Sequence, residues 1–342
     1  MRTLILKRSH GMGWRRLALA LALLVWAQFP AGGQTSPSQQ TNAERDKTTP
    51  LAPRMVTDEV GRHVEIPQPV RRIVSLAPNV TEMIYALGAE SRLVGDSDAC
   101  DYPPDAQKKT KVGGPFTPNL EQIVALKPDL VLIAANSGNR RETADALDLL
   151  HIPTYATNAF TIEDILKSIV DLGDVIGATE QARTVTASMR AKMDQLRTKL
   201  ADTKPAHVLF VIWQEPLISI GRNTFLADAL RLAGAESIID TRQDWPHVNM
   251  EEVVHLQPEY LVFAPDHSSE MATHLAALRS TPGWRDLKAV QENRVAVVSD
   301  AINRPAPRLI DAVVELARQL HPEAFANAPC GGGASHANGK AR

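Results

Sequence analysis

Hydrophobic and polar residues follow one another along this chain in blocks typical of a short helix and then a buried strand. The clearest block covers residues 119–131. Its Ile123 and Leu126 recur at helical spacing, and Pro128 predicts the end of that helix. The continuous apolar run Leu130–Ile133 then predicts a fully buried strand. Helix and strand repeated in this order predict a parallel sheet.

The same block occurs a second time in the chain. Residues 249–261 repeat the order of residue types, 130 positions later, and the run Gly-Ala-Glu-Ser precedes both copies, at Gly88–Ser91 and at Gly234–Ser237. Solenoid repeats are shorter, at roughly 20–50 residues. The long period therefore predicts two similarly built lobes, with a ligand-binding cleft between them.

Both copies begin with a residue that suits a helix N-cap. Asn119 and Asn249 are followed three positions later by Gln122 and Glu252, which predicts a capping box. Other segments predict a hairpin at Met55–Ile66, strands at Arg72–Leu76, from Val94, at His207–Ile212 and at Tyr260–Phe263, and a helix capped by Asn79 or Thr81 and stopped at Gly88.

Two helices are expected between the lobes. Ile162–Ile176 is amphipathic and is interrupted near Gly173 and Gly177. Thr179 then caps Glu180–Asp202, which contains neither Gly nor Pro. A helix of this length spans about 35 Å, roughly a domain diameter. It predicts one rigid strut between the lobes rather than a flexible hinge of extended linkers.

The two ends of the chain do not resemble folded structure. Residues 1–33 place basic residues before the apolar run Leu17–Phe29 and end in small residues, as in a secretory signal; an uncleaved membrane anchor is the alternative. The predicted divisions are a signal (1–33), a disordered linker (34–53), a first α/β lobe (54–160), connecting helices (161–204), a second α/β lobe (205–325) and a disordered tail (326–342).

Charge and cysteine content limit the classes of function and the number of disulfides that the chain can have. The signal segment holds five basic and no acidic side chains, so the mature chain expected after export is net acidic, which gives no support for nucleic-acid binding. The chain has two cysteines, Cys100 and Cys330, which leaves one disulfide possible.

Motifs of enzyme chemistry are absent from the sequence. It contains no strong phosphate loop, nucleophile elbow, paired-cysteine motif or His-Glu-x-x-His, and its ten histidines are scattered without the spacing of a zinc site. We therefore expect a binding protein with no catalytic residues, no metal site and no intrinsic cofactor.

The candidate ligand-binding residues are polar and aromatic side chains in loops and at strand ends, where open α/β sheets bind ligands. They are Ser75, Pro78, Asn79, Tyr102, Phe116 and Asn136 in the first lobe, and Trp213, Glu215, Trp245, His247, Asp300, Asn303 and Arg304 in the second. For three of them a structural role is the alternative to ligand binding. Trp245 would then cover the end of a sheet, Asn79 would cap a helix, and Arg304 would be a surface charge.

Glu121 and Glu251 occupy equivalent positions near the start of the two repeated helices. A carboxylate there interacts favourably with the helix dipole, by roughly 0.3–1 kcal/mol. Equivalent exposed carboxylates on both lobes also suit matched contacts with a two-fold symmetric partner.

Several of these segments together resemble a known family. Ser75–Glu82, Asp101–Pro104, Asn119–Val131, Asp244–Pro246 and Arg304–Arg308, in this order, are similar to the periplasmic cobalamin-binding proteins. These belong to the iron-siderophore and cobalamin class (class III) of substrate-binding proteins for ABC importers. The likeness covers about residues 56–325.

The resemblance implies two Rossmann-like α/β lobes with central parallel sheets, joined by a single long backbone helix, with small closure on the ligand. It implies that Glu121 and Glu251 dock onto arginines of a permease dimer in the inner membrane, and that Trp245 lies in the cleft. The chain departs from the family where aromatic residues that flank the corrin are replaced, as by Ala99 and Ala135. Phe116 and Trp213 are the candidates to compensate.

The expected function is that of a monomeric exported receptor that captures cobalamin or a related corrinoid and delivers it to an ABC importer. A ferric-siderophore or haem receptor of the same family is the alternative, since Tyr102 and His247 are candidate iron ligands. A secreted two-lobed metal-dependent enzyme and a structural or interaction protein are alternatives of different classes.

Overall fold

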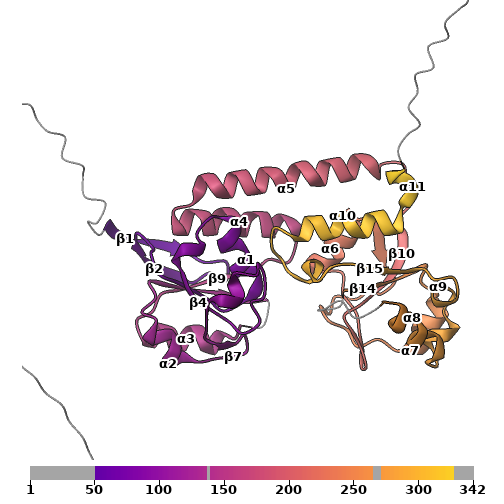
Figure 1. Cartoon of the computed structure of the whole chain (residues 1–342), viewed down its shortest axis with the longest axis horizontal. Helices are drawn as coiled ribbons and strands as arrows, with labels where there is room; N and C mark the ends of the chain where they lie inside the picture. The colour runs from indigo at the N-terminus through magenta and orange to yellow at the C-terminus, as the bar shows by residue number, and fades with distance from the viewer. Residues whose placement is uncertain (1–50, 137–138, 265–270, 327–342) are drawn as a thin grey trace, which may run out of the picture. The chain divides into compact units, whose positions relative to one another are not determined.

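The computed structural model describes residues 51–136, 139–264 and 271–326 (Figure 1). The predicted signal segment and Cys330 lie outside these residues, as does the tail from residue 327. Strand β1 begins at Leu51, so the fold includes three residues that the sequence assigned to the linker. No described helix is both long and apolar enough to cross a membrane.

Two separate parallel sheets form the centres of the two lobes. The first has the order β5 (Thr110–Lys111), β4 (Leu93–Asp96), β3 (Ile73–Ser75), β8 (Leu130–Ala134) and β9 (Thr154–Thr157). The second has the order β13 (Ala235–Ser237), β10 (Ala206–Val211), β14 (Tyr260–Phe263) and β15 (Val295–Val297). Every pairing within both sheets is parallel, which confirms the predicted architecture.

One face of both sheets is covered by a shared layer of helices. The layer consists of α1 (Pro78–Ala86), α4 (Ile162–Ile176), α5 (Thr179–Lys199), α6 (Phe225–Leu232) and α10 (Leu309–Leu320). In Figure 1, α5 runs above α4 and α10. Their apolar faces join residues of both sheets in one continuous hydrophobic core, from Ile73 in β3 to Val208 in β10. The two lobes are therefore built on a common rigid layer.

The opposite faces of the sheets have separate cores. Under the first sheet, Val131 packs with Ile123 of α2 (Leu120–Ala125) and Leu147 of α3 (Arg141–Leu149). Under the second, Leu261 packs with Val253 of α7 and with residues near the remaining short helices. These helices are α7 (Met250–Leu256), α8 (Met271–Ser280), η3 (Trp284–Asp286) and α9 (Lys288–Gln291).

The predicted N-terminal hairpin is present and protects a sheet edge. Strands β1 (Leu51–Thr57) and β2 (His63–Gln68) pair antiparallel. In the turn between them, the Glu59 N–H donates to the Ala156 carbonyl of edge strand β9 at 3.1 Å, and Asp58 accepts from the Ala156 N–H at 3.4 Å. An uncovered edge is a site for unwanted pairing with other chains, and this turn covers it.

Two predicted helix starts are wrong. Helix α1 begins at Pro78, with Ala77 as N-cap and no side-chain capping bond, because proline is favoured at the first helical position. Thr81 does not cap because it lies inside the helix, where its hydroxyl donates to Ser75 Oγ at 2.8 Å. Likewise, Thr179 lies inside α5 and donates to Asp174 at 2.6 Å, while Ala178 is the N-cap.

The helices between the lobes also differ in detail from the prediction. α5 has 21 residues and ends at Lys199, three positions before Asp202. α4 is not broken at Gly173, because this glycine makes room for α5: a Cβ there would lie 2.5 Å from the Ala182 Cβ. α4 ends as predicted at Gly177, which adopts the left-handed conformation (φ 72°).

The repeated segments have nearly the same backbone. Asn119 caps α2 by accepting from the Gln122 N–H at 3.1 Å, and Asn249 caps α7 by accepting from the Glu251 N–H at 2.9 Å. The predicted capping boxes are not formed at these two described helix starts. Lys127 and Gln257, each just before a proline, both have positive φ, of 48° and 47°.

Candidate functional site

The first notable contact between the lobes is an ionic cluster. The Arg304 guanidinium donates to both oxygens of Asp101, at 2.6 and 3.0 Å, and to Glu82 at 3.1 Å. Arg308 binds both oxygens of Glu82, at 2.8 and 2.7 Å. Asp300, at the start of η4 (Asp300–Asn303), contacts Arg304 at 2.9 Å. We call these five residues the ionic cluster.

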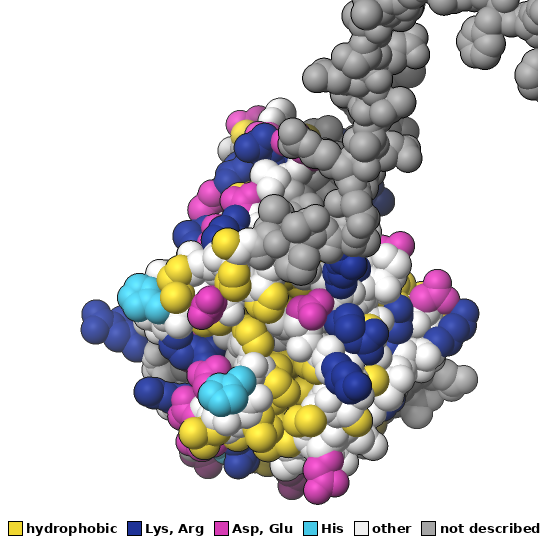
Figure 2. Space-filling view, turned by 90° about the vertical axis from the view of Figure 1, so that its left-hand side faces the viewer, with side chains coloured by type: hydrophobic (Ala, Val, Ile, Leu, Met, Phe, Trp, Pro, Cys, Tyr) yellow, Lys and Arg dark blue, Asp and Glu magenta, His cyan; other side chains and the backbone are white. Residues whose placement is uncertain are grey.

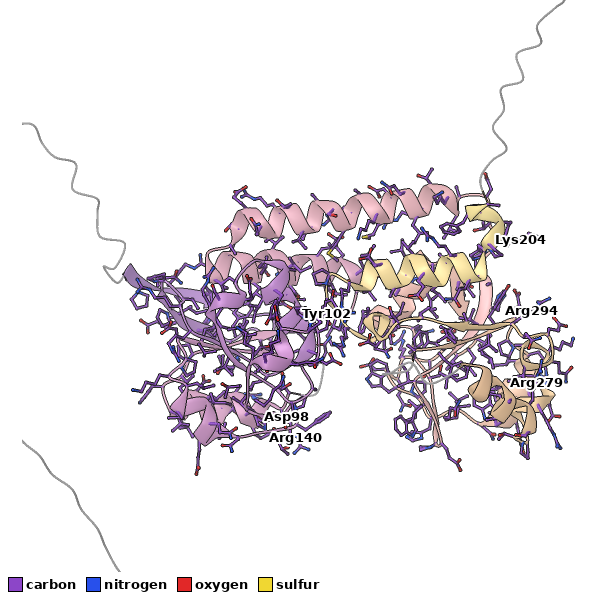
Figure 3. All side chains as sticks on the ribbon, in the orientation of Figure 1. Asp98, Tyr102, Arg140, Lys204, Arg279 and Arg294 are labelled. Atoms are coloured by element: carbon purple, nitrogen blue, oxygen red, sulfur yellow. The ribbon has the colours of Figure 1, made fainter. Side chains whose placement is uncertain are left out.

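The charges of the ionic cluster hold one another in the ionised state. Burial alone would lower the pKa of Arg304, but the carboxylates of Asp101, Glu82 and Asp300 outweigh burial and raise that pKa. In return, the hydrogen bond from Arg304 lowers the pKa of Asp101. Arg308 also stacks over the Tyr102 ring, 3.5 Å from its centroid, and Figure 3 shows Tyr102 on the side of the first lobe that faces the second.

The second contact between the lobes is a pocket. Its volume is about 180 Å³, and it is lined by Ala135, Asn136, Asn158, Ala159, Phe160, Thr224, Phe225, Asp244 and Trp245. The first-lobe residues directly follow the carboxyl ends of β8 and β9, where open α/β sheets bind ligands. Phe160 and Trp245, one from each lobe, are each 41% exposed. We call this cavity the cleft pocket.

The Trp245 loop is fixed by backbone bonds to the segment that follows a small hairpin, β11 (Trp213–Gln214) and β12 (Leu217–Ile218). The Ser219 N–H donates to the Pro246 carbonyl at 3.1 Å, and the Gly221 N–H donates to the Asp244 carbonyl at 2.9 Å. Position 221 has to be glycine, because a Cβ there would lie 1.8 Å from the Gln243 carbonyl oxygen. The pocket wall is thus rigid in its backbone.

On the first lobe, Asn139 and Glu59 hold the loops around the cleft pocket. Buried Asn139 accepts from the Ala134 N–H at 2.8 Å and donates to the Pro115 carbonyl at 2.8 Å. Glu59 accepts from the N–H of pocket residue Asn158 at 2.6 Å, and burial raises the Glu59 pKa. Sequence reasoning missed both, because neither belongs to a motif and their partners are remote in sequence.

Lys111 holds the loop that carries Asp101 and Tyr102. Its Nζ donates to Asp96 at 2.9 Å and to the carbonyls of Cys100 and Ala106, at 2.8 and 3.2 Å. Asp96 is fully buried, and burial raises its pKa to about 6 despite the bond from Lys111.

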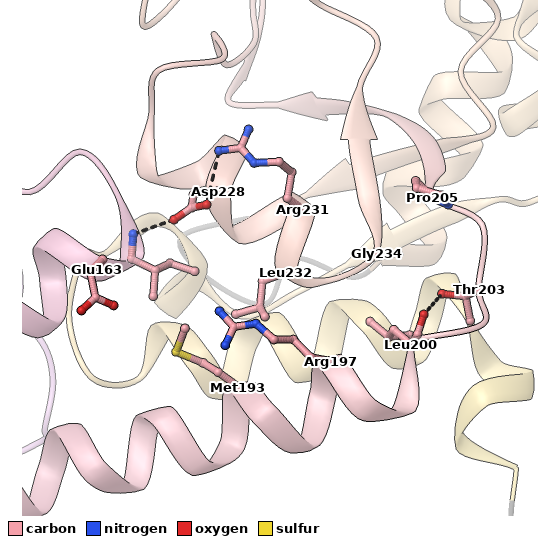
Figure 4. A pocket seen from close by; sticks show the side chains of 11 residues that line it. Glu163, Met193, Arg197, Leu200, Thr203, Pro205, Asp228, Arg231, Leu232 and Gly234 are labelled. Atoms are coloured by element: carbon pink, nitrogen blue, oxygen red, sulfur yellow. Dashed lines mark hydrogen bonds and ion pairs between the residues drawn. The ribbon is translucent and has the colours of Figure 1, made fainter.

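Cys100 and the cavity beside α5 do not add a chemical site. Cys100 is buried against Thr81 and Ser97, and burial raises its thiol pKa. Among the described residues, no group of three or more His, Cys, Asp or Glu side chains is arranged to hold a metal ion. A cavity of about 440 Å³ beside α5 (Figure 4) is lined by two carboxylates that already have partners: Asp228 accepts from the Ile162 N–H and from Arg231, and Glu163 pairs with Arg190.

A family comparison identifies the kind of protein. Residues 73–301 match the sequence profile of the family described as periplasmic binding protein. The chain belongs to the periplasmic binding protein family. This membership confirms the resemblance seen in the sequence, and it confirms the expectation of a binding protein rather than an enzyme.

Two relatives are similar to most of this chain. A vitamin B12-binding protein of Vibrio cholerae is 32% identical over 260 residues, covering 74% of this chain and 90% of that protein. An uncharacterized ABC transporter substrate-binding lipoprotein of Bacillus subtilis is 29% identical over 329 residues, covering 94% of this chain and 99% of that protein.

Solved structures share the fold of this family member. The periplasmic vitamin B12 binding protein of Vibrio cholerae aligns with a TM-score of 0.66 and 29% identity, over 76% of this chain and 99% of that one. The apo form of a periplasmic haem-binding protein of Roseiflexus aligns with a TM-score of 0.66 and 25% identity, over 75% and 99%. Both likenesses agree with two α/β lobes.

The structure distributes the predicted site residues over four environments. Asn136 and Trp245 line the cleft pocket, and Tyr102, Asp300 and Arg304 belong to or contact the ionic cluster. Phe116, Trp213, Glu215 and His247 are exposed on hairpins and loops. Ser75, Pro78, Asn79 and Asn303 are buried or half-buried, and the Ser75 hydroxyl donates to the Ala77 carbonyl at 3.1 Å. Phe160 and Asp244 of the pocket were not among the predicted residues.

Proposed function

We propose that this chain is a periplasmic receptor that binds cobalamin or a related corrinoid between its lobes and delivers it to an ABC importer. The observation that carries the proposal is the cleft pocket, which pairs Phe160 of one lobe with Trp245 of the other. A corrin is a broad, partly apolar disc with amide arms. Aromatic faces beside an amide such as Asn158 suit one edge of that disc, whereas the Asn136 amide donates to the Ala159 carbonyl.

The similarity to the vitamin B12-binding protein of Vibrio cholerae supports this choice of ligand. A ferric siderophore or haem is the alternative within the family, and its anionic groups would call for free arginines. Arg304 and Arg308 are already bound by Glu82, Asp101 and Asp300, which argues against that use.

Direct binding tests this proposal. The purified full chain is mixed with cobalamin and followed by calorimetry and tryptophan quenching, with hemin in a parallel titration. We expect saturable cobalamin binding at micromolar concentration or below. Absence of cobalamin binding together with a Soret shift on adding hemin would replace the corrinoid by haem.

We further propose that Glu121 and Glu251 dock onto the two-fold permease. Both side chains are exposed in the first turn of equivalent short helices, α2 and α7. Figure 2 views the molecule from the end of the first lobe, where acidic, basic and hydrophobic side chains are interspersed. Replacing both glutamates by Ala should leave ligand affinity unchanged and abolish uptake by cells; normal uptake would refute the docking role.

Export is part of the proposal, with cleavage of the predicted signal after residue 33. The mass of the protein recovered from the periplasm gives the mature N-terminus. Recovery of the uncut chain in the membrane fraction would instead support the anchor alternative.

A further inference from the structure

The cleft pocket contains one charge without a partner. Among the described residues that line it, Asp244 is the single ionisable side chain. Its carboxylate makes no ion pair and accepts no hydrogen bond within the described part of the chain. The carboxylates of the ionic cluster are all paired with arginine, so Asp244 differs from the other acidic groups between the lobes.

The backbone that carries this carboxylate is held in place. The Asp244 carbonyl accepts from the Gly221 N–H at 2.9 Å, and the neighbouring Gln243 carbonyl packs against Gly221, where no side chain fits. The next residue, Trp245, presents its ring to the same pocket. A carboxylate on a fixed backbone beside an aromatic residue is an arrangement that favours N–H donors and cations.

The same carboxylate opposes anions. Like charges brought together in a partly desolvated interface cost free energy, and such repulsion is one means by which binding sites reject wrong ligands. The described pocket residues include no Lys, Arg or His that would neutralise an incoming carboxylate.

We propose that Asp244 is a charge filter in the cleft pocket, which accepts a neutral or cationic N–H-donating edge of the ligand and rejects a carboxylate-bearing one. The inference rests on the proposed function of the cleft, and it adds the chemical property that the ligand presents there. Asp244 is thus a specificity-determining residue that accepts from an amide of the ligand.

The experiment compares two corrinoids that differ in one group. Cobalamin and its monocarboxylic derivatives, in which one side-chain amide is hydrolysed, are titrated by calorimetry at pH 7 into the full chain and its D244N variant. We expect the native protein to bind cobalamin at least 10-fold more tightly than the derivative that places its carboxylate at Asp244. In D244N this preference should fall to about threefold or less.

Asp240→Asn is the matched control, because it removes the same charge from an exposed carboxylate of the same lobe, paired with Arg222 outside the pocket. It should keep the native preference. An unchanged preference in folded D244N, or an equal loss in the control, would overturn the charge filter while leaving corrinoid binding intact.

Hemin provides a second readout that does not depend on corrinoid binding, since it carries two carboxylates. If the native chain binds no corrinoid, the proposed function fails, but the filter still predicts at least threefold tighter hemin binding by D244N. Equal or weaker hemin binding by D244N would then overturn the filter too.

Discussion

The two lobes of this protein meet in two chemically opposite ways. In the ionic cluster, three carboxylates and two guanidiniums are paired at 2.6–3.1 Å, and Tyr102 lies under Arg308. In the cleft pocket, the rings of Phe160 and Trp245 are 41% exposed and Asp244 has no partner among the described residues. A contact whose groups are all satisfied holds structure, whereas one with open groups is available to a ligand.

This difference changes the interpretation of Arg304. From the sequence it is a candidate ligand donor, but its N–H groups are directed to Glu82, Asp101 and Asp300. A ligand would have to displace a carboxylate to use it. We therefore expect substitutions in the ionic cluster to affect stability first, and substitutions in the cleft pocket to affect binding first.

The largest effect is expected from Glu82→Ala. It removes a carboxylate that is 2% exposed and leaves Arg308 with Asp300 at 4.0 Å as its nearest acidic partner. Breaking a buried pair on one side costs about 3–5 kcal/mol, and urea unfolding should show a loss of that size. Glu90→Ala, an exposed neighbour, should change stability by less than about 0.5 kcal/mol. A loss below about 1 kcal/mol for Glu82→Ala would show that the cluster does not hold the lobes.

The second effect is a pH dependence of the folding stability. It arises from Asp96, whose partner Lys111 holds the loop that carries Asp101 of the ionic cluster. Burial raises the pKa of Asp96 from 3.8 to about 6, so the folded state holds this proton more tightly than the unfolded chain does. The corresponding stability is present in full below about pH 4 and is lost as the pH rises through about 6. The loss is about 3 kcal/mol, since one pKa unit corresponds to about 1.4 kcal/mol.

Urea unfolding from pH 4 to pH 7 measures this loss as the difference between the native chain and Asp96→Asn. The advantage of the native chain should shrink by about 3 kcal/mol over that range. Asp98→Asn removes an exposed charge that contributes least to the raised Asp96 pKa, so it should reduce this pH dependence only slightly. A constant difference for Asp96→Asn would mean that Asp96 titrates normally.

The third effect is on binding and belongs to the cleft pocket. Trp245→Ala should weaken cobalamin binding by about 2 kcal/mol, or roughly 30-fold, because buried aromatic anchors dominate binding energies. The free energy of unfolding should change by less than about 1 kcal/mol, since Trp245 is 41% exposed in the free protein. Trp213 is 60% exposed and lies outside the pocket, so Trp213→Ala should weaken cobalamin binding, measured by calorimetry, less than Trp245→Ala does. Equal losses in both variants would contradict the distinction drawn for the pocket.

Local patterns were sufficient to predict most of the fold. The repeated block predicted α2, β8, α7 and β14, because helical spacing, capping asparagines and prolines act within a few residues. Errors occurred where tertiary packing overrides local preference. Gly173 does not break α4 because Ala182 of another helix packs against it, and no local pattern contains that contact.

The candidate site was harder to predict for the same reason. Trp245 could be found because a tryptophan in a polar loop is unusual, but Phe160 has no local signal, and Asp244 was noted only as part of the segment Asp244–Pro246. Glu59 accepts a hydrogen bond from Asn158, 99 positions later in the sequence, and Glu82 accepts one from Arg304, 222 positions later. Pairings over such distances depend on the assembled fold.

The smallest effect sharpens the comparison among ion pairs themselves. Arg190 of α5 pairs with Glu163 of α4, so this pair also joins two elements of the shared helical layer. Its side chains are 52% and 66% exposed, compared with 22% and 2% for Arg308 and Glu82.

Water screens exposed pairs, which contribute at most about 1 kcal/mol. Arg190→Ala should therefore lower the unfolding free energy by less than about 0.5 kcal/mol, and added salt should reduce even that difference. Salt should leave the Glu82→Ala loss nearly unchanged, because the Glu82 side chain is only 2% exposed. If the two variants cost the same, burial would not be what distinguishes the ionic cluster from ordinary surface charge.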